Sequence, residues 1–200
     1  MIELRGVSKR LGRKLVIRRA DLVVRPGQIV CLSGPSGVGK TTLLEIMAGL
    51  TKPDAGLARR QGAVALAFQD DALLPWLDAA GNMDYALAAL PPDQRRERRR
   101  FWLERFELPP TLRPEAMSGG MRRRLNLARA LASQRPILLL DEPFAFLDLP
   151  WQAKVAAELA AAAHVGAAVA LVSHQLEPLD GLPCRTIAVS ASPVDIVADA

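Results

Sequence analysis

Hydrophobic residues along the chain fall into short continuous runs that are separated by polar, glycine-rich or proline-rich breaks. Such runs are typical of strands buried on both faces of a parallel sheet, whereas apolar residues three and four positions apart indicate helices. The alternation of the two patterns predicts an α/β fold whose mostly parallel sheet is covered by helices on both faces. We expect strands at 2–8, 15–24, 28–34, 62–69, 136–143, 166–174 and 185–191, and helices at 41–50 and 151–165.

The middle of the chain follows a different pattern. From 72 to about 134 the sequence has helical spacing and is rich in arginine, with breaks at Pro91-Pro92 and Pro109-Pro110. Proline breaks helices because it lacks an N–H and clashes with the preceding turn. We therefore expect a single domain over residues 1–200, with a helical subdomain inserted at about 72–134.

The net charge of the chain is compatible with several classes of binding partner and does not distinguish among them. With 26 Lys and Arg against 21 Asp and Glu, the formal net charge is +5, which favours nucleic acid, anionic lipid or phosphate ligands. The arginine-rich segment 95–100 is followed by Phe101 and Trp102 as its nearest aromatic residues. With so few stacking partners, a solvated helix face is the favoured interpretation of this run over a surface for nucleic acid or lipid.

The number of cysteines and the hydropathy of the chain indicate in which cellular compartment the protein is located. Cys31 and Cys184 are the two cysteines, and two cysteines cannot form a disulfide framework, so we expect reduced thiols in a cytosolic protein. No apolar run approaches the roughly 20 residues of a membrane helix, and the first ten residues have no signal-peptide core. Any contact with a membrane is therefore expected to run through partner proteins.

The segment GPSGVGKT, from Gly34 to Thr41, matches a phosphate-binding pattern and stands between an expected strand and an expected helix. Glycines allow successive backbone N–H groups to point at one anion, and the helix start adds its positive dipole end. Lys40 should reach the β- and γ-phosphates of a nucleotide, and the Thr41 hydroxyl should ligate Mg²⁺. The expected nucleotide contacts are Gly34, Pro35, Ser36, Gly37, Val38, Gly39, Lys40, Thr41 and Thr42.

Polar residues end three other expected strands. Asp141 and Glu142 follow ILLL, Gln69 follows AVALAF, and His174 ends GAAVALVS. Ligands in open α/β sheets bind at the carboxyl ends of strands, so we expect these side chains beside the phosphates. Asp141 and Gln69 would then ligate Mg²⁺, and Glu142 would orient or deprotonate the attacking water. His174 would donate a hydrogen bond to the γ-phosphate, although His174 and Gln69 each fit equally well as simple strand-end caps.

A second glycine-rich helix start, MSGGMRRRL, occupies 117–125. Ser118 followed by Gly119 and Gly120 leaves backbone N–H groups unshielded, which makes either a second anion site or the start of an ordinary capped helix. Helical spacing then divides the segment into an apolar face and an outward arginine face. The apolar face comprises Met121, Leu125, Ala128 and Leu131, and the outward face Arg122, Arg123, Arg124 and Arg129.

Together these segments resemble the ATP-binding cassette (ABC) ATPases in order and spacing, over nearly the whole chain. The resemblance implies a P-loop NTPase fold with a small N-terminal antiparallel β subdomain, and hydrolysis of Mg²⁺-bound ATP by Glu142 and His174. It also implies a head-to-tail homodimer in which Ser118, Gly119, Gly120 and Met121 contact the partner's ATP and Asp148 lies at the interface. The matching motifs are GPSGVGKTT (Walker A), Gln69 (Q-loop), MSGGM (signature), ILLLDEP (Walker B), FLD at 146–148 (D-loop) and His174 (H-loop).

A finer resemblance concerns the transported solute. The stretch FQDDALLPWLDAAGNMDYAL and the methionine after SGG look like the nitrate/sulfonate/taurine importer group, and thiamine importers are similar. This implies an ATP-binding subunit on the inner face of the cell membrane that energises import of a small solute. Its partners would be integral-membrane permease subunits, to which Gln69 couples, and a periplasmic or extracellular solute-binding protein. No nucleic-acid partner is expected.

The chain departs from the family pattern in three places. Leu11 stands near the position where the family usually has an aromatic residue stacked on adenine, so Leu11 is the expected contact to the base. Ala145-Phe146 replaces smaller residues before the D-loop, and 56–69 is short for the usual β-hairpin. Two other classes compete with a transporter subunit. A DNA-associated ABC ATPase would carry coiled coils or zinc modules, and a small-molecule P-loop kinase would lack the SGGM, DEP and His174 combination.

Overall fold

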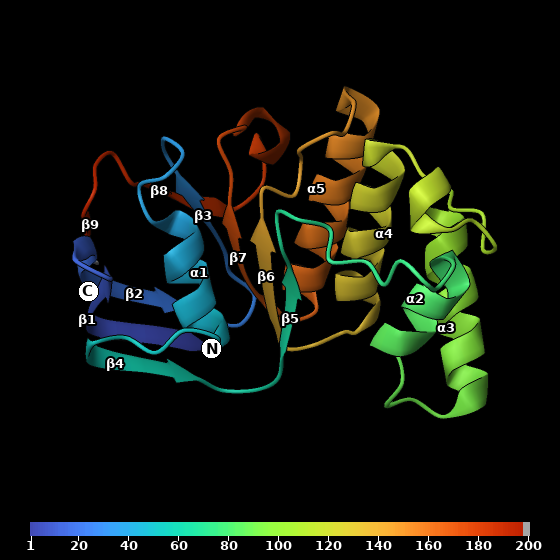
Figure 1. The fold of residues 1–200 in the computed structure, drawn as a ribbon, viewed down its shortest axis with the longest axis horizontal. Helices are drawn as coiled ribbons and strands as arrows, with labels where there is room; N and C mark the ends of the chain where they lie inside the picture. The colour runs from blue at the N-terminus through green and yellow to red at the C-terminus, as the bar shows by residue number, and fades with distance from the viewer. Residues whose placement is uncertain (198–200) are drawn as a thin grey trace.

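Two β-sheets form the framework of the computed structural model in the residues that it describes, 1–197 (Figure 1). The larger sheet has the order β5-β6-β7-β3-β8, and each of these pairings is parallel. The prediction of a mostly parallel sheet is therefore confirmed. Its strands are β3 (Ile29–Ser33), β5 (Val64–Ala67), β6 (Ile137–Asp141), β7 (Ala168–Val172) and β8 (Cys184–Ala188).

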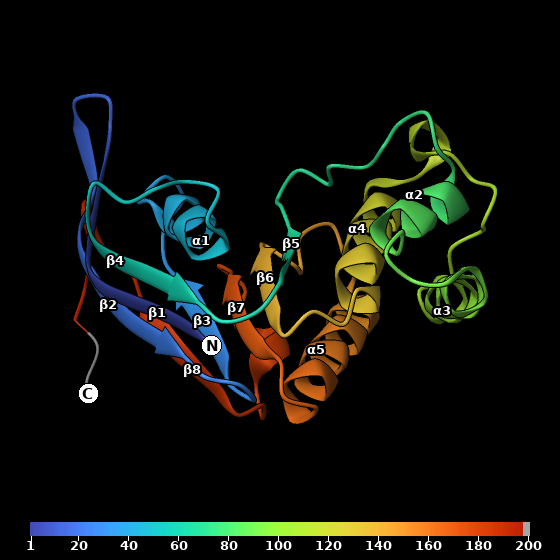
Figure 2. The same ribbon diagram turned by 90° about the horizontal axis from the view of Figure 1, so that it is seen from below.

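Helices cover both faces of the larger sheet, as the sequence predicts. Helix α1 lies between the two sheets, α4 and α5 cover the opposite face of the larger sheet, and α2 and α3 pack on the outer side of α4 (Figure 2). The helices are α1 (Lys40–Ala48), α2 (Ala79–Ala86), α3 (Pro92–Arg105), α4 (Gly119–Ala132) and α5 (Leu149–His164), with short 3₁₀ turns η1 (Pro114–Ala116) and η2 (Glu177–Leu179).

The strands of the larger sheet are apolar at successive positions because both faces are buried. In β6, Leu138 and Leu140 point into the core formed with α4 and α5, whereas Ile137 and Leu139 point into the core formed with α1. Successive side chains of a strand face opposite sides of the sheet, so a sheet covered twice needs an apolar residue at each position. This explains the uninterrupted ILLL run before the acidic pair.

The smaller sheet draws on both ends of the chain. Its order is β4-β1-β2-β9; β1 pairs antiparallel with β2 and β4, but β9 pairs parallel with β2. The expectation of an N-terminal antiparallel unit is therefore correct for β1 and β2 and incomplete, because neither β4 nor β9 was expected. The run VDI of β9 is too short and too polar to carry a strand signal. The bounds are β1 (Ile2–Leu11), β2 (Lys14–Val24), β4 (Ala55–Arg60) and β9 (Val194–Ile196).

The expectation that the arginines of α4 face outward is wrong. Arg123 is fully buried, and Arg122, Arg124 and Arg129 are half-buried. The reason is that α4 is covered on two sides, by the sheet and by α2 and α3, so its arginines are partly or fully buried. The guanidinium of Arg124 lies 4.2 Å from the centre of the Trp151 ring and donates to the carbonyl of Phe106.

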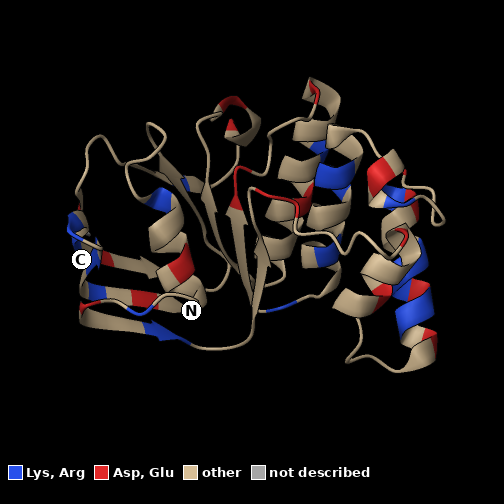
Figure 3. Ribbon diagram, in the orientation of Figure 1, with Lys and Arg blue, Asp and Glu red and all other residues tan. Residues whose placement is uncertain are grey.

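Helix α3 carries the arginine-rich segment 95–100, and Figure 3 shows its dense positive charge. Several of these arginines pair with nearby carboxylates: Arg96 with Asp93, and Arg99 with Asp84. The exposed side of α3 therefore carries charges of both signs, and ion pairs within the protein neutralise part of its positive charge. Among the helices of residues 1–197, none combines the length and the hydrophobicity needed to cross a membrane.

Both cysteines have free thiols. Burial raises the pKa of the Cys31 thiol to about 12, and it also raises the pKa of Cys184. Because the thiolate is the reactive form, Cys31 is expected to be chemically inert in the folded protein.

Candidate functional site

A cavity of about 480 Å³ opens at the carboxyl ends of β3, β6 and β7. Its lining brings together groups from five segments that are far apart in the sequence, including the glycine loop, the acidic pair and the end of β7. The lining residues are Leu11, Lys14, Val16, Ser36, Gly37, Gly39, Lys40, Thr41, Thr42, Gln69, Asp141, Glu142, Ala145, Phe146, Val172 and His174. The structure thus brings the strand-end polar residues Gln69, Asp141, Glu142 and His174 to one cavity with the glycine loop.

The loop between β3 and α1 needs glycine at two positions. Gly34 has φ 143°, and a Cβ there would stand 2.1 Å from the carbonyl oxygen of Val189. Gly39 has φ 120°, and a Cβ there would stand 2.6 Å from Cγ1 of Val16. Both positions combine a backbone conformation that side chains rarely adopt with a neighbour that leaves no room. The close packing fixes the loop at the cavity floor.

The start of α1 offers donors to an anion. Gly39 is the N-cap and supplies no side-chain hydrogen bond, so the first N–H groups of the helix have no capping side chain. Lys40 is buried, and its ammonium group donates to the carbonyl oxygens of Gly34 and Pro35, each at 2.7 Å. The positive charge is thus held inside the loop, where it adds to the helix dipole.

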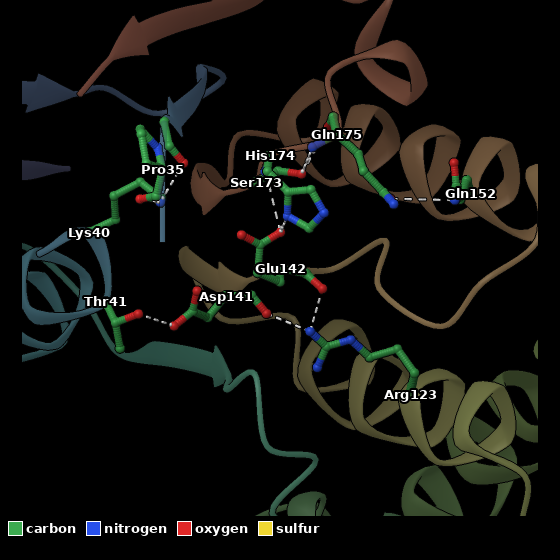
Figure 4. A network of polar contacts seen from close by, with 11 residues as sticks. Pro35, Lys40, Thr41, Arg123, Asp141, Glu142, Gln152, Ser173, His174 and Gln175 are labelled. Carbon is green, nitrogen blue, oxygen red and sulfur yellow. Dashed lines mark hydrogen bonds and ion pairs between the residues drawn. The ribbon is translucent and has the colours of Figure 1, made fainter. Parts of the chain in front are cut away.

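Asp141 and Thr41 meet at the end of β6. The Thr41 hydroxyl donates to Oδ2 of Asp141 at 2.7 Å (Figure 4). Oδ1 of Asp141 is buried and has no hydrogen-bond partner among residues 1–197. Burial raises the pKa of the Asp141 carboxyl, an effect that the bond from Thr41 partly offsets. A buried carboxylate oxygen with free lone pairs, next to a hydroxyl, fits a hard divalent cation such as Mg²⁺.

No group of three or more His, Cys, Asp or Glu side chains within residues 1–197 is arranged to hold a metal ion. A cation here would therefore take few ligands from the protein. This fits Mg²⁺, which keeps several waters and commonly binds through one or two side chains together with the phosphates of a nucleotide. The donor set of Thr41, Asp141 and the nearby Gln69 is of that kind.

Glu142 adopts an unusual backbone conformation. Its φ is 49°, in the left-handed region that non-glycine residues seldom occupy. Its N–H donates to the carbonyl of Val172 at 2.8 Å, which ties the end of β6 to the end of β7. The carboxylate is largely buried, and its Oε2 lies 2.8 Å from Nδ1 of His174 and accepts the His174 backbone N–H at 3.3 Å. Figure 4 shows the imidazole directly beside the carboxylate.

Gln69 and Leu11 lie at the rim of the cavity. The side chain of Gln69 is exposed just after β5, which is shorter than the expected strand and ends at Ala67. Leu11 ends β1 at the tip of the hairpin with β2, and about half of it (51%) is exposed. Both are free to contact a ligand.

The second glycine-rich helix start does not line this cavity. Ser118 is the N-cap of α4, and its hydroxyl accepts the N–H of Met121 at 3.2 Å. Gly120 packs closely against Phe146, since a Cβ at Gly120 would lie 3.0 Å from the Phe146 carbonyl oxygen. Asp148 caps α5 by accepting the N–H of Trp151 at 3.0 Å. Within one chain, the residues around Ser118 therefore do not belong to the cavity that the phosphate loop lines.

Sequence reasoning missed the part that Arg123 has at this site. Its guanidinium donates to the main-chain carbonyls of Asp141 and Glu142, which are predicted site residues, and of Phe68, which precedes Gln69. A signal was available in the spacing: Arg123 lies four positions before Leu127 and seven before Ala130, so the three share one stripe of α4. That stripe faces the sheet.

A family model described as ABC transporter matches residues 17–145 of the chain. The chain belongs to the ABC transporter family. Among curated relatives of this ABC ATPase, the aliphatic sulfonates import ATP-binding protein SsuB 1 of Xanthomonas axonopodis pv. citri (strain 306) is 37% identical over 206 residues, covering 96% of the chain and 82% of the relative. SsuB of Mycobacterium avium (strain 104) is 43% identical over 150 residues, covering 73% of the chain and 60% of the relative.

Solved structures agree with this assignment. A dimeric ATP-binding cassette in a post-hydrolysis state, bound to ADP and phosphate, has a TM-score of 0.82 and 28% identity, covering 89% of this chain and 90% of that one. A dimeric bacterial ABC transporter cassette has a TM-score of 0.83 and 26% identity, covering all of both chains. The fold is that of an ABC-type P-loop ATPase, and ATP hydrolysis is the reaction of this family.

Proposed function

We propose that this ABC ATPase energises the import of a small solute, with an aliphatic sulfonate as the first candidate. The observation that supports this solute is the sequence similarity to sulfonate import ATP-binding proteins. The nitrate, taurine and thiamine systems are alternatives that the motifs also resemble. Because the cavity binds the nucleotide, solute selection would belong to the permease and to an external solute-binding protein.

Nucleotide binding would rest on the phosphate loop and its neighbours. The N–H groups at the start of α1 and the ammonium of Lys40 would hold the β- and γ-phosphates, with Gly34, Gly37 and Gly39 allowing close approach of the backbone. Leu11 would contact the base from the hairpin tip. Thr41, Asp141 and Gln69 would hold Mg²⁺, which, when bound, neutralises charge on the phosphates. The full set of proposed contacts includes Pro35, Ser36, Val38 and Thr42.

Glu142 and His174 would carry the hydrolytic step. Glu142 would orient the attacking water or take its proton through the carboxylate oxygen that His174 leaves free. His174 would donate a hydrogen bond from Nε2 to the γ-phosphate, while Nδ1 stays beside Glu142. The 2.8 Å distance between Nδ1 and Oε2 supports this arrangement because it leaves Nε2 as the ring atom available to the ligand.

Completion of the site would require a second copy of the chain. Ser118, Gly119, Gly120 and Met121 stand apart from the phosphate loop of their own chain, and the similar cassettes were solved as dimers. In a head-to-tail homodimer these residues would cover the partner's ATP, with Asp148 at the interface. Each subunit of the dimer would be a single domain with a helical subdomain at about 72–134. The dimer would bind permease subunits at the inner face of the membrane, and Gln69 would couple those subunits to the ATP.

The variant Glu142→Gln tests the proposed chemistry in the full chain. It removes the basic carboxylate but keeps shape and size, so ATP should still bind while hydrolysis falls about 100-fold or more. The stalled variant should run as a dimer in size-exclusion chromatography with ATP and as a monomer without it. Glu97→Gln, an exposed glutamate on α3, is the control and should hydrolyse ATP normally. Normal turnover by Glu142→Gln, or a monomer in the presence of ATP, would contradict the proposal.

The solute is tested by growth. A strain lacking the chain should fail to grow on an aliphatic sulfonate as sole sulfur source while growing normally on sulfate, and the wild-type chain should restore growth. Lys40→Ala should not restore it, because the variant lacks the charge that holds the phosphates. Normal growth on sulfonates without the chain would exclude this solute class, and parallel cultures on nitrate and taurine and without thiamine would identify the alternative.

A further inference from the structure

Arg123 is the largest fully buried side chain of the described residues, and it carries a charge. Burying a guanidinium is costly unless polar groups surround it. Here it donates to the carbonyl of Phe68 at 2.6 Å and approaches that of Gln69 at 3.4 Å, and its other terminal nitrogen donates to the carbonyls of Asp141 and Glu142. Oδ1 of Asp71 lies 3.6 Å from the first of these nitrogens, and Nε of Arg123 is buried without a hydrogen-bond partner in the described residues.

These carbonyls belong to two segments that leave the sheet side by side. Strands β5 and β6 are paired up to Ala67 and Leu140, and no sheet pairing joins them beyond that point in the described residues. Arg123 bridges the two segments at the point where the hydrogen bonds between β5 and β6 end. It thereby holds Gln69 and Glu142, the two residues proposed to contact the cation and the water, at a set separation.

The contact with Glu142 acts on a strained peptide. Residue 142 is held in the left-handed region by a bond at each end: its N–H donates to Val172, and its carbonyl accepts from Arg123 (Figure 4). Such a conformation persists only when the surroundings over-determine it. The direction in which the Glu142 carboxylate leaves the backbone therefore depends on Arg123, which never touches the carboxylate itself.

Arg123 also belongs to the helix that begins at Ser118. It lies little more than one turn after that N-cap, so a movement of the start of α4 would be transmitted to the carbonyls of both segments. Asn126, on the same stripe of the helix, adds a bond to the Phe68 carbonyl at 3.1 Å. The helix start, Gln69 and Glu142 are thus joined through one buried side chain.

We propose that Arg123 is a positioning residue for ATP hydrolysis, which holds the backbone of Gln69 and Glu142 in register with the helix that begins at Ser118. The inference rests on the proposed role of Glu142. In this proposal Arg123 makes no contact with ATP, so its loss should affect the rate of hydrolysis and not the binding of ATP. Loss of the guanidinium should lower kcat and leave the affinity for ATP nearly unchanged.

The test compares Arg123→Met with Arg129→Met in the full chain. Arg129 is the matched control because it lies on the same helix, is half-buried, and donates to one main-chain carbonyl, that of Ala72, away from the cavity. Arg123→Met should lower kcat about tenfold or more while the affinity for ATP stays within about threefold. Arg129→Met should change kcat by less than about twofold. An equal loss of kcat in both variants at matched Tm would overturn the proposal.

A double variant distinguishes positioning from general loosening of the fold. If Arg123 acts through the Glu142 carboxylate, adding Arg123→Met to Glu142→Gln should not reduce the residual hydrolysis further. Multiplying losses would overturn the proposal. Glu142→Gln alone reports on the proposed function: normal turnover in that variant would disprove the role of Glu142, whatever Arg123 does.

Arg123→Lys covers the case in which the methionine variant does not fold. Lysine keeps the charge and much of the volume, but its single ammonium cannot replace a planar fork that serves two segments. It should fold, bind ATP and hydrolyse it about tenfold more slowly than the wild type. Wild-type kcat in Arg123→Lys would show that charge alone suffices and that the bridging geometry has no role.

Discussion

Nδ1 of His174 lies 2.8 Å from Oε2 of Glu142, and the same carboxylate oxygen accepts the backbone N–H of His174 at 3.3 Å. One residue therefore contacts the carboxylate independently through its imidazole and its backbone N–H. The backbone bond does not depend on the side chain and is available to any residue except proline, so the imidazole and the main chain can be separated experimentally.

His174→Ala should bind ATP like the wild type and hydrolyse it about 10- to 100-fold more slowly, because a donor to the γ-phosphate is lost while Glu142 keeps its backbone bond. Phosphate release at saturating ATP measures the change. The other histidine, His164, is exposed at the end of α5 and provides the control. His164→Ala should be fully active, and an equally active His174→Ala would remove the imidazole from the mechanism.

Leu11→Tyr should strengthen nucleotide binding. Leu11 is half-exposed at the rim of the cavity, where an aromatic ring can stack on adenine and gain about 1 kcal/mol, which corresponds to an approximately fivefold lower Kd for ATP. Titration of a fluorescent ATP analogue measures the affinity. Leu50→Tyr places the same ring on an exposed turn after α1 and should change nothing. An unchanged Kd in Leu11→Tyr would show that residue 11 does not meet the base.

Ser118 has a structural role in its own chain and a proposed one in the dimer, and two substitutions separate them. Ser118→Ala removes the cap on Met121 and should lower the stability by about 1 kcal/mol. Ser118→Asp keeps a capping oxygen and the stability, but it places a negative charge where the partner's phosphates would lie. We expect Ser118→Asp to have a normal Tm and to lose ATP-dependent dimerisation. Normal dimerisation and turnover in Ser118→Asp would show that Ser118 does not face the partner's ATP.

Asp141→Asn should make the protein more stable at neutral pH. Burial raises the pKa of the Asp141 carboxyl, so its charged form is penalised in the folded state, and stability is lost as the pH rises through the folded-state pKa. The neutral amide avoids this penalty; each 1 kcal/mol corresponds to about 2–4 °C in Tm for a chain of this size. The gain should disappear below the ordinary pKa of aspartate, where the wild-type carboxyl is also neutral.

The same variant should lose Mg²⁺-dependent hydrolysis, since the amide replaces the proposed carboxylate ligand. Thermal unfolding across pH, with and without MgATP, measures both effects. A Tm lower than the wild type at pH 7 would show that the buried carboxylate stabilises the fold instead of serving the site.

Local patterns predicted the parts of the site that depend on neighbouring residues. The loop before Lys40 follows from glycine spacing between a strand and a helix, and the nearness of Asp141 and Thr41 follows from the rule that parallel strands end at one edge. Helical spacing places Arg123 on the stripe of α4 that faces the sheet, but its hydrogen-bond partners could not be predicted in this way. Its environment is made by Phe68 and Glu142, which the chain brings together from distant segments.

The smaller sheet gives a second example. The three residues of β9 form a strand because β2 offers them an unpaired edge, and nothing in their own sequence favours it. The expectation that the arginines of α4 face outward was wrong for a related reason. Helical spacing gives the direction of a side chain, but it does not show which other elements cover that side chain. α2 and α3 close over that side of the helix.

The sequence by itself determined the strands of the larger sheet, the helices α1 and α5, the phosphate loop and the set of polar residues at the strand ends, because each of these depends on residues that are close together in the chain. The tertiary structure alone decided that Glu142 is held in a strained conformation between Val172 and Arg123, and that the helix of Ser118 is joined to that residue. Burial and hydrogen bonding between distant segments are properties of the packed molecule. The site of one buried guanidinium, whose terminal nitrogens donate to carbonyls of several segments, is specified by all of those segments together.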